Sequence, residues 1–465
     1  MAVSSKEINN ILSEYFNIID LYFGSIKHHL GKDEDSHIDL ATHMARYPLV
    51  SDLIIDAIDD IDEQINDFWQ KNLKLVVEYV KQQDSLKCLY SGDISPVILE
   101  NFVKRSAFYI DTVILADPIY NLTLFQKQII LDRKYYLQKL IRHVFNIWKL
   151  KDLALLDSPH KVILILPINL HLVNQEDRNG LIATADQNLA AYVGRVLDVK
   201  LESGEACLDY LEKETTADGL FKQFKHPELL PRVFASQESF QEFLTDFSNT
   251  GKFAKFKEKE SVGWDFGIYL RSQFIRVQEH KYFCEKLVAE PIYDYELPWF
   301  FFNYEMGGVD MDAAIATALQ SEKFNWISKV PLSAITVMRA ENKLEYMRSV
   351  LRQGVTDLKA KKDKDLIVVG EQVEANLKDA FAKQDSEIGV LQAQVNKIVR
   401  KDIPITSAGF FAGFIPPPYG TVVSLLFAGR DIKKSLSEKA ALEKTINQKN
   451  KNFINLLLRS YERKD

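Results

Sequence analysis

The chain has 465 residues, of which 46% are hydrophobic and 26% charged, and its formal net charge is −7 at pH 7. This length gives room for two or three domains, each with its own core, and the hydrophobic content excludes general disorder. The modest net charge gives the whole chain no electrostatic attraction for nucleic acid, so nucleic acid is not an expected partner.

Cysteine usage and the N-terminal residues indicate the compartment. Cys88, Cys207 and Cys284 are odd in number, lie far apart and include no Cys-x-x-Cys pair. This argues against a disulfide framework and a thiolate zinc site, and it fits a reducing cytoplasm. Residues 1–16 show no basic region followed by an uninterrupted apolar core and a small-residue cleavage site. We therefore expect no secretory signal and a cytoplasmic location.

Apolar residues at three- and four-residue steps predict amphipathic helices over most of residues 1–150, the first of them over residues 5–30. A second helix, from about Ser51, combines an apolar stripe with an acidic one. The acidic stripe consists of Asp52, Asp56, Asp59, Glu63 and Asp67. Carboxylates at this spacing could bind a divalent cation, but no glycine-containing calcium loop and no Glu-x-x-His pair accompanies them. We expect a solvated acidic face.

Four of the nine histidines lie between these two helices, at His28, His29, His37 and His43, with acidic residues among them. Their clustering hints at metal binding, but the spacings match no zinc signature. The segment is polar enough to form a plain surface loop. We expect neither a metal nor a cofactor.

The middle of the chain contains the clearest strand signal. The run from Lys161 to Val173 is β-branched and apolar, which predicts a buried strand that Pro167 splits or bends. Residues 108–116 fit a strand or a buried helix equally well, because periodicity alone does not decide between them. Four consecutive aromatic residues, Trp299 to Phe302, are typical of a core anchor. A small mixed α/β region is the expected result.

One pattern in this region permits a catalytic hypothesis. Some metal-dependent nucleases carry an acidic residue and then an acid-x-Lys triplet on a strand, and Asp186 with Asp198 and Lys200 could occupy these positions. Such a triplet is common in a chain with this many charged residues, so a nuclease is the most remote alternative. No phosphate-binding loop, His-Glu-x-x-His or Gly-x-Ser-x-Gly motif occurs. The sequence leaves the question of an enzyme open, and the lack of a catalytic motif favours a non-enzymatic protein.

The C-terminal third is the most regular part of the chain. Apolar residues between positions 363 and 400 recur at nearly heptad spacing, which predicts a long helix, about 55 Å if continuous, packed in a coiled coil with one or two partners. Residues 431–463 form a second predicted helix that could pair with the first. Residues 430–465 contain ten basic and five acidic side chains, an excess that would suit an anionic surface.

Between these two helices lies an insert without a single charged residue, Ile403 to Gly429. Three prolines at positions 416–418, followed by Gly420, predict a turn, so the insert reads as a hairpin. Each half has about ten residues, whereas a membrane-spanning helix needs roughly 20. Basic residues flank both ends, so a hairpin that met a membrane would dip in and return to the same side. So large an apolar patch must be covered, and we expect burial against the chain itself or an oligomeric partner, with a lipid surface as the alternative. The residues expected to make its contacts are Phe410, Phe411, Phe414, Leu425, Leu426 and Phe427.

Together these patterns predict a mainly α protein in three parts: an N-terminal helical region (1–150), a mixed α/β middle region (151–330), and a long C-terminal helical hairpin (331–465) that carries the uncharged insert 403–429. The first function hypothesis is a non-enzymatic interaction or assembly protein that binds a protein partner or a second copy of itself through the long helices and the apolar hairpin. The alternative is a membrane-perturbing effector that uses the 403–429 hairpin on a membrane surface.

Overall fold

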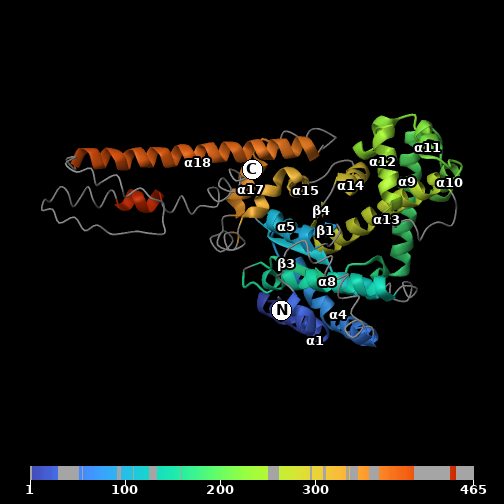
Figure 1. The fold of residues 1–465 in the computed structure, drawn as a ribbon, viewed down its shortest axis with the longest axis horizontal. Helices are drawn as coiled ribbons and strands as arrows, with labels where there is room; N and C mark the ends of the chain where they lie inside the picture. Colours follow the sequence, from blue (N-terminus) through green and yellow to red (C-terminus); the bar gives the residue numbers. More distant parts are fainter. Residues whose placement is uncertain are drawn as a thin grey trace.

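The computed structural model describes residues 3–29, 52–54, 56–91, 96–107, 109–124, 133–158, 160–249, 261–293, 296–306, 311–330, 335, 344–355, 366–402 and 440–446. Helices make up most of these residues, and one small sheet lies near the middle of the body (Figure 1). The prediction of a mainly α protein with a small strand-containing region is confirmed.

The helices fall into three groups along the chain. The first group comprises α1 (Ser5–Phe23), η1 (Gly24–His29), α4 (Ile58–Gln82), α5 (Pro96–Ala107), α6 (Pro118–Leu124) and α8 (Arg133–Ala154). The second comprises η2 (Leu170–Leu172), α9 (Gln175–Leu197), α10 (Gly204–Leu211), α11 (Ala217–Gln223), η3 (Pro227–Leu229), η4 (Arg232–Phe234), α12 (Gln237–Asn249) and α13 (Val262–Leu287). The third comprises α14 (Glu296–Met306), α15 (Met311–Ala318), η5 (Glu322–Lys329), α17 (Leu344–Arg352) and α18 (Leu366–Asp402).

Four parallel strands form the sheet, in the order β3-β2-β1-β4. They are β1 (Lys87–Ser91), β2 (Thr112–Ala116), β3 (Ile163–Leu166) and β4 (Glu290–Tyr293). The chain therefore moves outward from β1 to β3, passes through the second group of helices, and returns to place β4 on the free side of β1. The strands take residues from both sides of position 150, and one hydrophobic cluster extends from Ile8 to Phe381.

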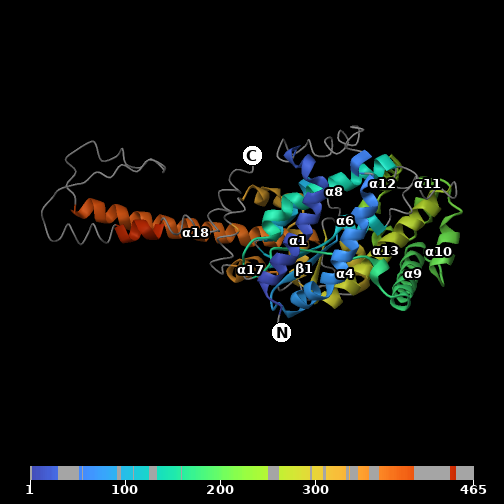
Figure 2. The same cartoon turned by 90° about the horizontal axis from the view of Figure 1, so that it is seen from below.

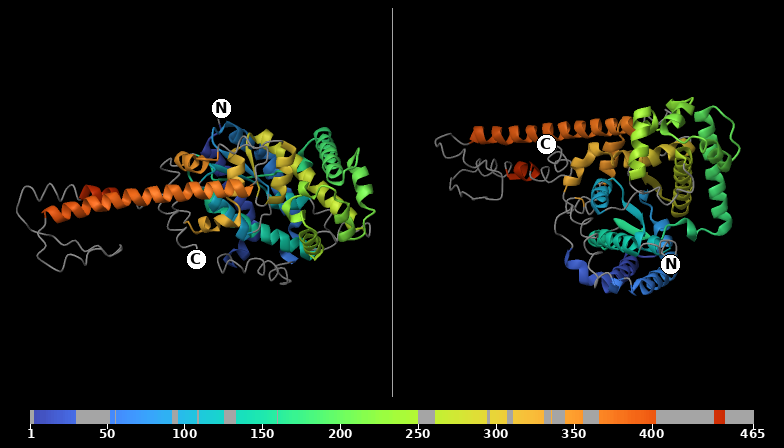
Figure 3. Two further views of the ribbon diagram at one scale, coloured as in Figure 1. Left: turned by 90° about the horizontal axis from the view of Figure 1, so that it is seen from above. Right: turned by 45° about the vertical axis from the view of Figure 1, so that its right-hand side comes forward.

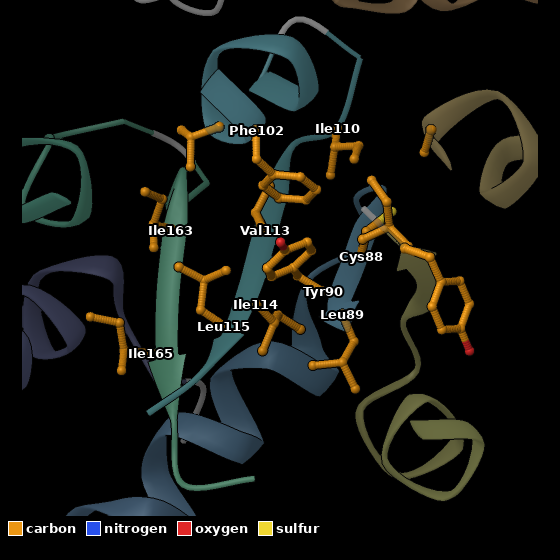
Figure 4. Packing of buried hydrophobic residues seen from close by; sticks show 14 of the residues in the cluster. Cys88, Leu89, Tyr90, Phe102, Ile110, Val113, Ile114, Leu115, Ile163 and Ile165 are labelled. Atoms are coloured by element: carbon orange, nitrogen blue, oxygen red, sulfur yellow. The ribbon is translucent and has the colours of Figure 1, made fainter. Parts of the chain in front are cut away.

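The strands are almost continuously apolar because helices enclose the sheet. Parallel sheets are normally covered on both faces, and such strands lose the alternation of polar and apolar residues. Ile114 and Leu164 are fully buried. Helix α5 contacts β2, α8 contacts β3, and α13 contacts both β1 and β4. Figure 4 shows side chains of three strands packed together, with the rings of Tyr90 and Phe102 in contact at a centroid separation of 4.0 Å.

Several sequence expectations can be compared with this sheet. The strand expected between residues 161 and 173 forms as β3 and ends at Leu166, directly before Pro167. The ambiguous stretch 108–116 contains β2. Trp299, Phe301 and Phe302 lie on α14 and are buried, so the aromatic run does anchor the core. Two strands, β1 and β4, lie where no strand was expected, because each has at most five residues and its charged or proline residues hide the apolar signal.

A buried carboxylate holds the first helices to the sheet. Asp117 directly follows β2 and accepts hydrogen bonds from the Tyr15 hydroxyl (2.8 Å) and the Trp69 indole N–H (2.7 Å), as well as from the N–H groups of Ile119 and Tyr120. Burial raises the pKa of Asp117, and these four donors partly oppose that shift. The side chain thus joins α1 and α4 to the start of α6 at the carboxyl end of β2.

A buried histidine joins α13 to strands β1 and β4. The Nε2 atom of His280 lies 2.9 Å from the carbonyl oxygen of Leu89 in β1, and its Nδ1 lies 2.8 Å from the hydroxyl of Tyr293 in β4. Nε2 therefore donates to the carbonyl, and Nδ1 is left to accept from the hydroxyl. Burial lowers the pKa of His280 to about 3, so the imidazole is neutral in the native protein at physiological pH.

This burial predicts a loss of stability in mild acid. An unfolded histidine takes up its proton near pH 6.5, whereas His280 in the native protein stays neutral down to about pH 3. Between these values the unfolded chain binds the extra proton, so the free energy of unfolding falls as pH falls, by about 1.4 kcal/mol per pH unit for this group. Urea unfolding at several pH values measures the slope, which His280→Asn should reduce by this amount.

Tyr293→Phe is the matched control for this experiment. It removes one hydrogen bond, at a cost of about 1 kcal/mol, but it leaves the histidine buried, so the pH slope should persist. An equal slope in the wild-type protein and in His280→Asn would contradict the assignment.

Candidate functional site

The long helix α18 is the feature that stands out from the body (Figures 1 and 2). It has 37 residues and is about 55 Å long at 1.5 Å per residue, as the heptad-like pattern predicted. In its first half, Val369, Val373, Leu377 and Phe381 are buried, and the Phe381 ring lies 6.2 Å from that of Trp326. Beyond these residues Gln384 is still buried, whereas several of the following side chains are exposed, and Val390 is 55% exposed. One half of the helix is anchored and the other half projects.

We call the projecting half, residues 385–402, the arm. Figure 3 shows from two further directions that the arm extends away from the sheet and from the helices around it. The elements that contact the first half of α18 are α15 and α17, and η5 contributes Trp326. The arm therefore begins where the body of the protein ends.

Polar contacts fix the anchored half of α18 at its position. The side-chain amide of Asn376 donates to the carbonyl oxygens of Leu351 (3.2 Å) and Gln353 at the end of α17. The next residue, Gly354, has a φ of +75°, a left-handed conformation that suits glycine, and an added Cβ would lie 2.8 Å from the Gln372 amide of α18. The left-handed conformation favours glycine at this turn, because the end of the Gln372 side chain could move aside but the backbone strain would remain.

Helix α17 is in turn held to the sheet by a buried arginine. Arg348 donates from Nε to the carbonyl oxygen of Tyr109 at 2.9 Å, and its Nη2 forms an ion pair with Asp111, the residue directly before β2. Asp111 also accepts the N–H of Leu86 at 2.9 Å. The side chains of Arg348 and Asp111 are 11% and 9% exposed, so the pair is shielded from solvent.

A second arginine one turn later adds a more exposed contact. Arg352 makes a two-bond contact with Asp312 of α15, at 2.8 and 2.6 Å, and the Tyr109 hydroxyl donates to the same carboxylate at 2.5 Å. Burial raises the pKa of Tyr109, and the Asp312 charge raises it further, so the phenol stays protonated. The arm is thus connected through α17 and α15 to the amino-terminal end of strand β2.

The insert follows the arm directly. Helix α18 ends at Asp402, and residues 403–429, with all six expected contact residues, lie outside the described part of the chain. Their role as an interaction surface stays a prediction. Within the described residues, no helix is both long enough and apolar enough to span a membrane.

The acidic stripe behaves as a solvated face. Asp52, Asp56, Asp59, Glu63 and Asp67 are all exposed. Among the described residues no group of three or more His, Cys, Asp or Glu side chains is placed to hold a metal ion. The positions of His37 and His43, and the side chains of His28 and His29, lie outside the described part.

The nuclease pattern is not assembled as its chemistry would require. Asp186 lies on α9, where Arg271 of α13 binds both of its carboxylate oxygens at 2.6 and 2.8 Å. Asp198 ends the same helix in a left-handed conformation, and the exposed Lys200 pairs with Glu202 at 3.2 Å. The remote nuclease alternative would need a strand that carries Asp198 and Lys200, and the described residues form none at these positions.

The sequence did not reveal Arg348, Arg352 and Asp312 as the groups that anchor the arm. One signal was present, since the two arginines lie four residues apart on a short helix whose buried positions are all apolar: Leu344, Met347, Val350 and Leu351. A charge next to a buried face in this way indicates a partner carboxylate. The identity of that partner required the fold.

Removing the buried arginine should destabilise the protein strongly. Arg348→Ala leaves the carboxylate of Asp111 buried without its ion pair, which costs about 3–5 kcal/mol in the free energy of unfolding. Arg352→Ala removes a contact whose arginine is 39% exposed and should cost no more than about 1 kcal/mol. Urea unfolding of the full chain measures both values.

A double variant separates the charge from the packing. Asp111→Asn with Arg348→Met leaves no unpaired buried charge, so it should be more stable than Arg348→Ala alone. Equal losses for Arg348→Ala and Arg352→Ala would show that the buried pair has no special part in holding α17 to the sheet.

No protein-family model, curated protein or solved structure matches the chain. The arm, the insert and the contacts that hold them are the features that point to a function.

Proposed function

We propose that this chain is a non-enzymatic interaction or assembly protein that uses α18 to carry the apolar insert 403–429 away from its body and present it to a protein partner or to a second copy. The observation that carries the proposal is the geometry of α18, whose first half is buried on the body and whose second half projects and leads directly into the insert.

The anchoring of α18 supports this role. A helix that presents a binding segment at its end must be held rigidly at its base, or the segment would lose affinity through its freedom of motion. Buried apolar residues, the Asn376 amide and the Arg348–Asp111 pair supply such a base. The distance from the sheet to the insert is then set by the helix.

The composition of the insert supports the choice of an apolar partner surface. Burial of a large aliphatic or aromatic side chain is worth about 1.5–3 kcal/mol, and the insert offers several of them within 27 residues that carry no charge. Monomeric proteins rarely leave such a patch in water. A protein surface of matching apolar character would cover it.

Deleting residues 404–429 from the full chain tests the proposal. Sedimentation velocity over a range of concentrations should show self-association of the intact protein, or its complex with a partner captured by the intact chain, and both should be lost in the deletion. The pair Phe411→Asp and Leu426→Asp should act in the same way, because each would place an unpaired charge in the interface. The matched control is Val390→Asp, on an exposed position of the arm.

Co-sedimentation with anionic and with neutral liposomes distinguishes the alternative. Binding of the intact protein to liposomes, lost on deletion of residues 404–429 and without any self-association or partner, would favour a membrane-perturbing effector instead. Unchanged association in the deletion variant would rule out the insert as the interaction element.

A further inference from the structure

The face that anchors α18 to the body continues along the arm. After Phe381, Gln384 is still buried, and Glu387 and Leu391 follow it at three- and four-residue steps, which keeps them on the same side of the helix. Both are half-buried, whereas Val390 is exposed and so is Gly389. Something therefore covers this face beyond the point where α15 and α17 end.

A short helical segment of the same chain lies beside the arm. Residues 440–446 are helical, and Figures 1, 2 and 3 all place them next to the projecting half of α18. Within this segment Leu442, Thr445 and Ile446 are half-buried, and the other four residues are exposed. The three covered residues share one face of a helix, as the spacing of three and four residues requires.

We propose that residues 440–446 pack antiparallel against the arm, with Leu442 opposite Leu391 and Ile446 opposite the aliphatic stem of Glu387. The covered residues lie four apart on each helix, so both pairings hold in a single register. An antiparallel direction follows from the chain between them, because three consecutive prolines after Ile415 reverse a chain more readily than they extend a helix.

In this pairing residues 440–446, the return segment of the same chain, cover the half-buried face of the arm. A second copy cannot then use that face for an intermolecular coiled coil, and the insert is the surface left for the proposed interaction. The inference concerns the arm on which the proposed function rests, but it does not require that the insert binds anything.

Disulfide formation between introduced cysteines tests the pairing in the full chain. Leu391→Cys with Leu442→Cys should form an intramolecular disulfide rapidly under mild oxidation, since facing positions bring the two side chains together. Val390→Cys with Leu442→Cys is the matched control and should react at least tenfold more slowly. Glu387→Cys with Leu442→Cys would react faster than the first pair if the helices were parallel.

The product separates the possible occupants of the face. An intramolecular link, identified by mass spectrometry of the joined peptides and independent of protein concentration, supports the pairing. A covalent dimer would assign the face to a second copy, and an absence of faster linkage in the Leu391 pair would remove the return segment from it. The native cysteines Cys88, Cys207 and Cys284 are buried and free, so they do not compete.

Hydrogen exchange provides a readout that does not depend on cysteine chemistry. Leu391→Lys should speed amide exchange in residues 440–446 by at least tenfold, and Val390→Lys should leave it unchanged. Equal exchange in both variants would overturn the pairing. If the pairing failed while deletion of residues 404–429 still abolished association, the proposed function would stand without it.

Discussion

The position of α17 against the sheet depends on the buried ion pair between Arg348 and Asp111. On one side lies the parallel sheet, whose strand β2 begins immediately after Asp111. On the other lies α17, which α18 packs against. A buried pair adds little net stability compared with apolar residues of the same size, but its two side chains must approach each other closely to avoid an uncompensated buried charge. We therefore see it as a device that sets the direction of α18 more than its affinity for the body.

Position and direction are the properties of α18 that the described contacts determine. The buried polar groups of the described residues serve structure: Asp117 joins two helices to a strand end, and His280 joins a helix to two strands. Asp186 is occupied by Arg271. What remains distinctive is a long helix that projects from the body and leads into an uncharged segment. This combination supports the interaction hypothesis.

The sequence predicted the elements whose apolar pattern repeats over many residues, and it missed the features that depend on contacts between single residues. The regular apolar spacing of α18 and the apolar run of β3 were visible, because each contains its own pattern. Strand β1 begins at Lys87, whose buried amine donates to the carbonyl oxygens of Val80 and Gln83, so a charged residue hides a strand start. The contacts that anchor α18 could be identified only from the fold, because they join residues far apart in the sequence. The description of the insert rests on its composition.

The order of the strands has a consequence for how the chain is made. Strand β1 receives its second neighbour only when β4 arrives, roughly 200 residues after β1 leaves the ribosome. At ordinary rates of about 5–20 residues per second, this takes roughly 10–40 s. Throughout that time one side of β1 offers unpaired backbone groups, which are a template for pairing with another chain. The nascent protein thus needs its early helices, or a chaperone, to shield an edge that the finished protein no longer has.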